Sequence, residues 1–191
     1  EMLKKPADLR YTMFFTPRSG SSWVTDVVTK AARIGMPGEY FNPNHMNRIS
    51  NAFNATDMDE YCDIMLRRRQ TNGVFGFQIT EHQLRAVFGD ADTFMQRFPE
   101  RKCFWLIRED IVLQGISLFK MQHTQISHAP QASDEELRER EKQVVYNARE
   151  IEQWIRHIHV AEIGTEALIQ KYDLHPFRMS YERNTGLTPR R

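Results

Sequence analysis

The sequence predicts an α/β fold in which a parallel β-sheet is flanked by helices. Short apolar or aromatic runs of strand length occur at 11–15, 74–79, 102–107 and 177–181. The segments between these runs are long enough for crossover helices, which parallel strands require. The first run also leads through a Gly/Ser loop directly into an amphipathic run, and such a strand–loop–helix unit is typical of anion-binding α/β proteins.

Hydrophobic periodicity and capping signals predict the helices. They are expected at 22–33, 57–70, 80–88, 110–121, 133–163 and 165–172. The first of these has an apolar face, and Gly35 is a suitable stop for it. Ser133 begins a capping box, so one long helix is expected from there to about Ile163, with Thr165 capping the next. The Asn-rich segment 41–55 is interpreted as a polar loop.

The loop after the first strand reads Thr16-Pro17-Arg18-Ser19-Gly20-Ser21-Ser22. It has no lysine after Gly20, which disfavours a Walker-type nucleotide loop and therefore an ordinary kinase or NTPase. It also has no cysteine, since Cys62 and Cys103 lie far away in sequence, so a cysteine phosphatase is disfavoured. What remains is a cradle of hydroxyls, amides and one guanidinium, which suits stabilisation of an anionic group in transfer. Sulfuryl transfer fits that description.

Four motifs in order along the chain then resemble a known family. They are TPRSGSS at 16–22, GEYF at 38–41, NGVFGFQI at 72–79 and LIREDIVLQGISLF at 106–119. Over roughly positions 10–182 the sequence resembles the bacterial sulfotransferases related to trehalose 2-sulfotransferase. The resemblance implies a P-loop NTPase-like sulfotransferase fold. It also implies transfer of a sulfuryl group from 3'-phosphoadenosine 5'-phosphosulfate to a hydroxyl, with a carbohydrate or glycolipid as the expected acceptor.

The resemblance also implies which residues bind the donor. Arg18 and the loop residues Ser19, Gly20, Ser21 and Ser22 would hold the 5'-phosphosulfate, with Arg18 acting on the leaving oxygen. Arg108 and Ser117 resemble the residues that hold the 3'-phosphate. Arg108 would lie at the carboxyl end of a strand, where open α/β sheets bind ligands. The alternative for Arg108 is a surface ion cluster with Glu109 or Asp110.

Glu39 is the candidate general base, because a glutamate in this segment has that role in the resembled family. A positioned carboxylate assists loss of a hydroxyl proton. Two plainer roles for Glu39 stay open, namely capping a helix and pairing with an arginine. A histidine base also stays open, at His45, His82 or His123. Gln78 stands where the resembled pattern has a lysine, which leaves the identity of the acceptor open.

Composition limits the remaining classes. The chain has 191 residues and a formal net charge of +1, so we expect a single domain over 1–191 and no nucleic-acid partner. Arg67, Arg68 and Arg69 are expected to decorate the solvated end of a helix. The seven histidines and two cysteines show no metal-ligand spacing, and no metal is expected. No apolar run approaches the roughly 18 residues of a membrane helix.

Three further expectations concern the setting of the protein. The scarcity of cysteine suits a reducing compartment, so a cytoplasmic location is expected. The resemblance makes a homodimer one option. The resembled proteins continue with a helical segment after about residue 182, so part of the C-terminal region is expected to be lacking. Two other functions stay open, a P-loop phosphotransferase and a non-catalytic protein that binds a nucleotide or anion.

Overall fold

The four predicted apolar runs form one parallel sheet. The computed structural model describes residues 4–100, 102–126 and 133–186. In this part of the chain the strands are β1 (Leu9–Phe15), β2 (Val74–Ile79), β3 (Cys103–Ile107) and β4 (Phe177–Ser180), in the order β2-β1-β3-β4. In the register of the sheet, Phe14 lies opposite Ile79 on one side and Trp105 on the other. The predicted α/β class is confirmed, whereas residues 187–191 of the C-terminal region lie outside the described residues.

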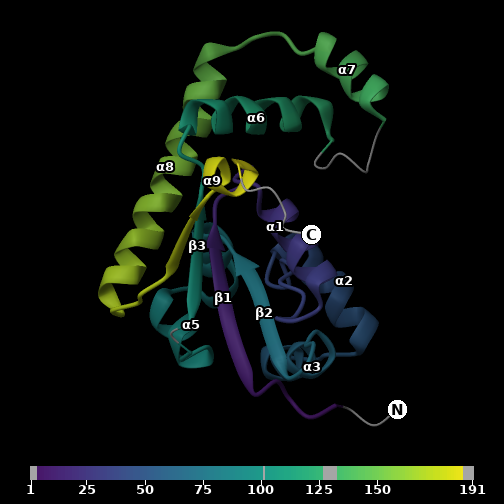
Figure 1. Ribbon diagram of the computed structural model, residues 1–191, viewed down its shortest axis with the longest axis vertical. Coiled ribbons are helices and arrows are strands. Elements are labelled where there is room, and N and C mark those ends of the chain that lie inside the picture. Colours follow the sequence, from purple (N-terminus) through teal and green to yellow (C-terminus); the bar gives the residue numbers. More distant parts are fainter. Residues whose placement is uncertain (1–3, 101, 127–132, 187–191) are drawn as a thin grey trace.

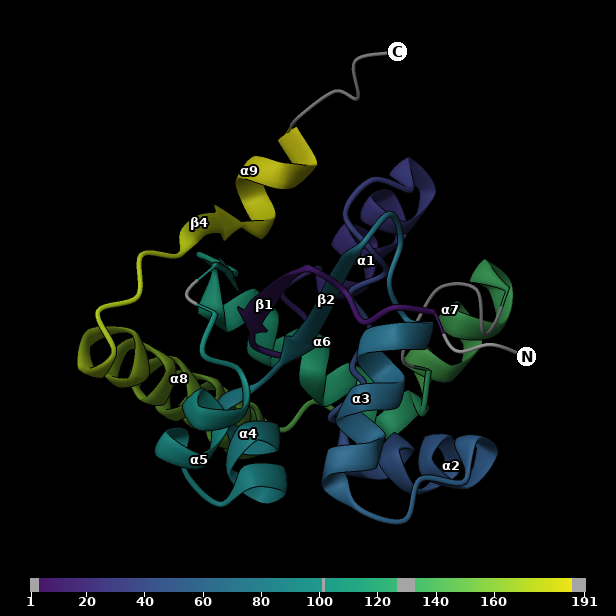
Figure 2. The ribbon, with the colours of Figure 1, turned by 90° about the horizontal axis from the view of Figure 1, so that it is seen from below.

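Helices connect the strands and surround the sheet. They are α1 (Ser21–Ala31), α2 (Pro43–Phe53), α3 (Met58–Arg68), α4 (Glu81–Phe88), α5 (Ala91–Arg97), α6 (Ile111–Thr124), α7 (Asp134–Lys142), α8 (Ala148–Lys171) and α9 (Tyr181–Gly186). Figure 2 shows α2 to α5 and α8 gathered on one side of the strands, with α1 and α9 toward the other. Figure 1 shows α6 and α9 beside the ends at which β1 and β3 finish. This end of the sheet is therefore where the loop after β1 lies.

Several helix ends follow from the capping residues that the sequence contains. Thr80 and Gln83 form a reciprocal capping box at the start of α4. Asp110 caps α6 by accepting a hydrogen bond from the backbone N–H of Leu113. The predicted stop of α1 at Gly35 is wrong, because Ala32 already adopts a left-handed conformation with φ of 51° and ends the helix.

The segment predicted as one long helix is two helices. The chain leaves the helical path between α7 and α8, and the Asn147 side chain caps α8 by accepting from the N–H of Glu150. Val145, which continues the apolar spacing in the sequence, is 82% exposed. The predicted cap at Thr165 is also wrong. Thr165 is inside α8, and its hydroxyl donates to the carbonyl of Ala161.

The Asn-rich segment is helical, contrary to the prediction of a loop. Asn42 caps α2 with its side chain, and Pro43 occupies the first turn, where its missing N–H is not needed. Two short helices, α5 and α9, are also absent from the sequence prediction. The last begins at Tyr181, which the sequence placed in the fourth strand.

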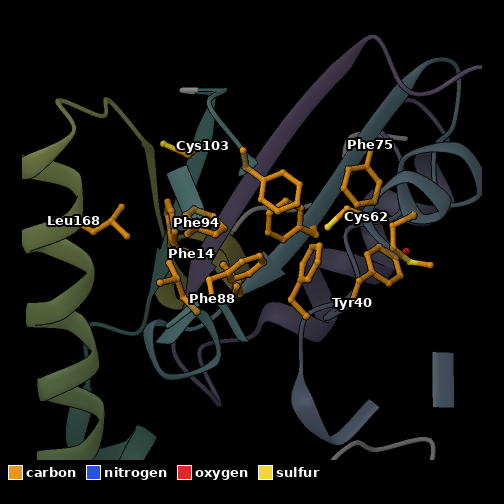
Figure 3. Close-up of a cluster of buried hydrophobic side chains, with 14 of the residues drawn as sticks. Phe14, Tyr40, Cys62, Phe75, Phe88, Phe94, Cys103 and Leu168 are labelled. Carbon is orange, nitrogen blue, oxygen red and sulfur yellow. The ribbon is translucent and has the colours of Figure 1, made fainter. Parts of the chain in front are cut away.

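The core on the helix-rich side is dominated by aromatic rings. Phe41 makes ring contacts with Phe77 and Phe98, at centroid distances of 4.9 Å and 5.3 Å. Figure 3 shows Phe14, Phe88 and Phe94 close together, with Leu168 of α8 directed toward this cluster. Both cysteines are buried and free. This packing holds the sheet firmly against α2 to α5 and α8, and so fixes the strand ends from which the functional loops start.

Candidate functional site

The loop between β1 and α1 has the backbone geometry of an anion cradle. Arg18 and Gly20 both adopt left-handed conformations, with φ of 66° and 86°. Between them the N–H of Ser19 donates to the carbonyl of Thr16 over 3.3 Å, which closes a tight turn. The turn leads into the amino end of α1, where the N-cap residue Gly20 has no side chain to cap the first N–H groups of the helix. A non-glycine residue in a left-handed conformation is costly and is typical of functional sites. The left-handed conformation of Arg18 therefore destabilises the fold slightly, as is common where a loop is shaped for binding.

Side chains of helix α6 hold the loop between β1 and α1 in place by hydrogen bonds. Gln114 is fully buried, and its Nε2 donates to Thr16 Oγ1 over 2.9 Å and to the carbonyl of Pro17 over 2.7 Å. Ser117, one turn further along, accepts a hydrogen bond of 2.9 Å from Arg18 Nε. Two residues that are about a hundred positions from the loop therefore hold it in place.

The two predicted arginines converge. The pKa of Arg18 is lowered, first because burial disfavours its charge and second because Arg108 places a like charge nearby. Arg108 Nε is buried and has no hydrogen-bond partner among the described residues. Two cations brought together in a partly buried place are a good receptor for a multiply charged anion.

Tyr181 links Arg108 to the loop and was missed by the sequence prediction. Its ring lies 4.6 Å from the guanidinium carbon of Arg108. It also packs against Gly20 so closely that a Cβ there would come within 2.7 Å of the ring. Gly20 is needed for this approach as well as for its φ. A signal for Tyr181 was absent from the sequence, because one tyrosine after a strand is common.

Glu182 fixes the turn that carries Arg108. Its carboxylate accepts hydrogen bonds from the N–H groups of Glu109, over 2.9 Å, and Asp110, over 3.3 Å, and lies 3.9 Å from Arg108 Nε. Burial raises the pKa of Glu182, but these N–H groups and Arg108 outweigh burial and lower it. The sequence left open an ion cluster of Arg108 with Glu109 or Asp110. The carboxylate that Arg108 contacts is instead that of Glu182, and Glu109 pairs with Arg183 over 3.6 Å.

The loop serines differ in their surroundings. Ser19 is fully buried, and its hydroxyl has no hydrogen-bond partner among the described residues. Ser21 is buried in the first turn of α1, whereas Ser22 is exposed. A buried hydroxyl without a partner is costly unless a ligand or water satisfies it. Ser19 therefore fits a loop that closes around an anion.

Glu39 lies beside the end of β2. The preceding residue, Gly38, bridges to Phe77, and its carbonyl accepts from the N–H of Gln78 over 3.0 Å. The Gln78 side chain donates to Thr25 of α1 over 3.2 Å, and Thr25 in turn donates to the carbonyl of Pro37 over 3.0 Å. This network ties the Glu39 segment to the second turn of α1. Gln78 therefore supports the Glu39 segment through its hydrogen bond to Thr25, whereas the lysine of the resembled pattern would bring a positive charge to this position.

The partners of the Glu39 carboxylate are two side-chain amides. Asn42 Nδ2 and Gln83 Nε2 each donate to Glu39 Oε2 over 2.8 Å. Glu39 is half-buried. In the described part of the chain it neither caps a helix nor pairs with an arginine, the two plainer roles that the sequence left open.

The histidines that the sequence kept as alternatives lie in other surroundings. His82 stacks on His157, with ring centroids 4.2 Å apart. His123 contacts Glu150 over 3.1 Å, and His45 is exposed on α2. Glu150 and His157 also line a cavity of about 500 Å³ along the first turns of α8, and none of the predicted site residues lines that cavity.

Two kinds of feature are absent from residues 4–100, 102–126 and 133–186. No group of three or more His, Cys, Asp or Glu side chains is arranged to hold a metal ion. Within these same ranges, no helix combines the length and apolar character needed to span a membrane.

Comparison with known proteins places these features in one family. The Stf0 sulphotransferase family model matches residues 10–186, which includes the loop, Glu39, Arg108, Ser117 and Tyr181. No curated protein matches the sequence.

Proposed function

The chain belongs to the Stf0 sulphotransferase family, and from this premise we propose the donor, the acceptor class and the residues that act. The proposed donor is 3'-phosphoadenosine 5'-phosphosulfate, and the proposed acceptor is a hydroxyl of a carbohydrate or glycolipid. The parallel sheet with flanking helices is consistent with the sulfotransferase fold. In this proposal residues 1–191 act as a single sulfotransferase domain in the cytoplasm, which agrees with two free, buried cysteines.

The observation that carries the proposal is that the Tyr181 ring contacts both Arg108 and Gly20, and so brings Arg108 beside the loop that contains Arg18. The donor has two separate phosphate-bearing ends, and the two cations come from the ends of two adjacent strands, β1 and β3. We assign the 5'-phosphosulfate to Arg18 and to the loop residues Ser19, Gly20, Ser21 and Ser22. We assign the 3'-phosphate to Arg108 and Ser117. Ser19 Oγ and Arg108 Nε are buried and have no hydrogen-bond partner among the described residues, so each fits an anionic oxygen at its place.

The proposed reaction is an in-line transfer. The bond between sulfur and the bridging phosphate oxygen breaks as the acceptor oxygen bonds to sulfur, and the nucleotide leaves as the 3',5'-bisphosphate. Glu39 takes the proton of the acceptor hydroxyl. Arg18 and the loop N–H groups stabilise the negative charge that develops on the bridging oxygen. The proposal uses no metal ion, because a sulfuryl group carries less charge than a phosphoryl group.

A nucleotide screen by thermal unfolding tests the proposal. We expect 3'-phosphoadenosine 5'-phosphate to raise the unfolding temperature more than adenosine 5'-phosphate does. Stabilisation by ATP with magnesium instead would favour a P-loop phosphotransferase. Binding of the bisphosphate without sulfuryl transfer to any of a panel of sugars and glycolipids would favour a non-catalytic binding protein.

A further inference from the structure

Two helix-capping side chains share one oxygen of Glu39. Asn42 caps α2, where its Oδ1 accepts from the backbone N–H of Asn44 over 3.1 Å. Gln83 closes the capping box of α4, where its Oε1 accepts from the N–H of Thr80 over 3.0 Å. Each amide then has its nitrogen left over, and both nitrogens donate to Glu39 Oε2 over 2.8 Å.

The backbone fixes which way these amides point. The oxygen and nitrogen of a side-chain amide are assigned from their hydrogen-bond partners. The N–H groups of Asn44 and Thr80 can only donate, so an amide oxygen must face each of them. The NH₂ group of Asn42 and that of Gln83 must consequently face Glu39. Reversing either amide would break a helix cap and set an oxygen against a carboxylate.

The residue types at both positions are more specific than capping requires. An N-cap position accepts Asp as readily as Asn, and the third position of a capping box accepts Glu as well as Gln. A carboxylate would cap equally well but has no hydrogen to donate. Only the amide form can cap the helix and also hold Glu39, and the amide form is present at both Asn42 and Gln83.

The arrangement selects one oxygen of Glu39 for chemistry. Both hydrogen bonds that described side chains donate to this carboxylate end on Oε2. Oε1 is then the oxygen available to accept a proton. The two donors are neutral, so they orient the carboxylate without adding a positive charge beside it. Because each donor belongs to the first turn of a different helix, the carboxylate is held from two directions.

We infer that Asn42 and Gln83 are positioning residues that hold Glu39 by Oε2 and present Oε1 to the acceptor hydroxyl. This inference rests on the proposed function, in which Glu39 is the base. Helices α2 and α4 thereby set the position of the base relative to β2. The sequence interpretation of 41–55 as a polar loop gave Asn42 no such role.

The test uses Gln83→Glu and Asn42→Asp, which keep both caps and replace a donor with a carboxylate. Two carboxylates in contact do not ionise together readily. We expect each variant to move the acidic limb of the turnover-against-pH profile upward by about one pH unit or more, measured with an acceptor from the panel that the parent sulfates. The same upward movement is expected for the Glu39 carboxyl carbon followed by NMR titration, a readout that needs no acceptor. Affinity for the 3',5'-bisphosphate should stay near the parent value, whereas the unfolding temperature should fall at pH 8, where both adjacent carboxylates must ionise, and stay near the parent value at pH 4.

The matched control is Asn147→Asp. Asn147 also caps a helix with its side chain, at the start of α8, and the described structure shows no contact between it and Glu39. This control should leave both the pH profile and the NMR titration unchanged.

The possible failures are distinguishable. If Glu39→Gln keeps the parent's turnover of an acceptor that the parent sulfates, then Glu39 is not the base, and both the proposed mechanism and this inference are overturned. If Glu39→Gln is inactive but Gln83→Glu and Asn42→Asp titrate and turn over like the parent, the proposed mechanism stands and the inference is wrong.

Discussion

Arg18 combines a left-handed backbone conformation with a directed side chain, because its Nε donates to Ser117 across the site. Replacing Arg18 with alanine removes the charge that would stabilise the leaving oxygen. We expect sulfuryl transfer to fall about 10²- to 10³-fold, in line with the loss of one preorganised donor in other enzymes. Initial rates measure this. Arg156→Ala, which removes an exposed cation paired with Glu152 on α8, should have no such effect, and equal loss in both variants would contradict the assignment.

Gly20 offers a second residue-level prediction, with Gly73 as its control. Both glycines have positive φ, 86° and 76°, so alanine should cost about 1–2 kcal/mol of unfolding free energy at either position. A Cβ at Gly73 meets the end of the Asp8 side chain at an ordinary contact distance of 3.8 Å, whereas a Cβ at Gly20 meets the Tyr181 ring at 2.7 Å. Gly20→Ala should therefore cost about 1–3 kcal/mol more. Denaturant unfolding of the two variants checks the difference, and equal losses would rule out the tight contact with Tyr181.

At the scale of elements, α8 brings a carboxylate against the start of the loop. Burial raises the pKa of Glu162. The nearby His159 and the Thr16 hydroxyl lower this pKa, but by less than burial raises it, so the net shift is upward. A raised pKa in the fold means that ionisation destabilises the native state. Stability from this group is therefore full below the unfolded value of about 4.3 and is lost as pH rises through the higher folded value.

Glu162→Gln should thus raise the unfolding temperature at pH 8 relative to the parent and give little gain at pH 4. Thermal unfolding at the two pH values measures this. Glu166→Gln is the control one turn further along α8, where the carboxylate pairs with Arg178 over 3.3 Å in a more exposed position. It should bring no gain at pH 8. If the unfolding temperature of Glu162→Gln depends on pH as that of the parent does, the ionisation of Glu162 does not destabilise the native state.

The elements also show where sequence patterns have physical limits. The strands were predictable because buried parallel strands are continuous apolar runs. Helix α2 was missed because asparagines favour turns, although Asn42 followed by Pro43 is a helix-start signal. The break before α8 was missed because Val145 continues the apolar period while facing solvent. Periodicity records which residues are apolar, and tertiary packing decides which of them are covered.

At the scale of the whole molecule, the site exists because parallel strands finish at one edge of the sheet. That rule let the sequence place Arg108 at a strand end where ligands bind, and the family resemblance assigned it to the same donor as Arg18. The rule could not predict Tyr181 or Gln83. The contact of Tyr181 with Gly20 depends on how β4 ends beside the loop, and Gln83 is fully explained as a capping residue until the position of Glu39 is known.

The two-strand origin of the site gives a prediction about nucleotide choice. Arg108 follows β3, stacks on Tyr181 and is assigned to the 3'-phosphate, whereas Arg18 is assigned to the other end of the donor. Arg108→Ala should abolish the preference for adenosine 3',5'-bisphosphate over adenosine 5'-phosphate while leaving the weaker binding of the latter largely intact. Calorimetric titration with the two nucleotides measures the preference.

Arg178 provides the matched control for that experiment. Like Arg108 it stacks on an aromatic ring, with its guanidinium carbon 4.5 Å from the Trp105 centroid, and contacts a carboxylate, that of Glu166. It lies in β4, however, and the described structure shows no contact between it and the loop. Arg178→Ala should keep the full preference for the bisphosphate, so its loss there would point to a general effect of losing a stacked arginine. Survival of the preference in Arg108→Ala would place the 3'-phosphate elsewhere in the molecule.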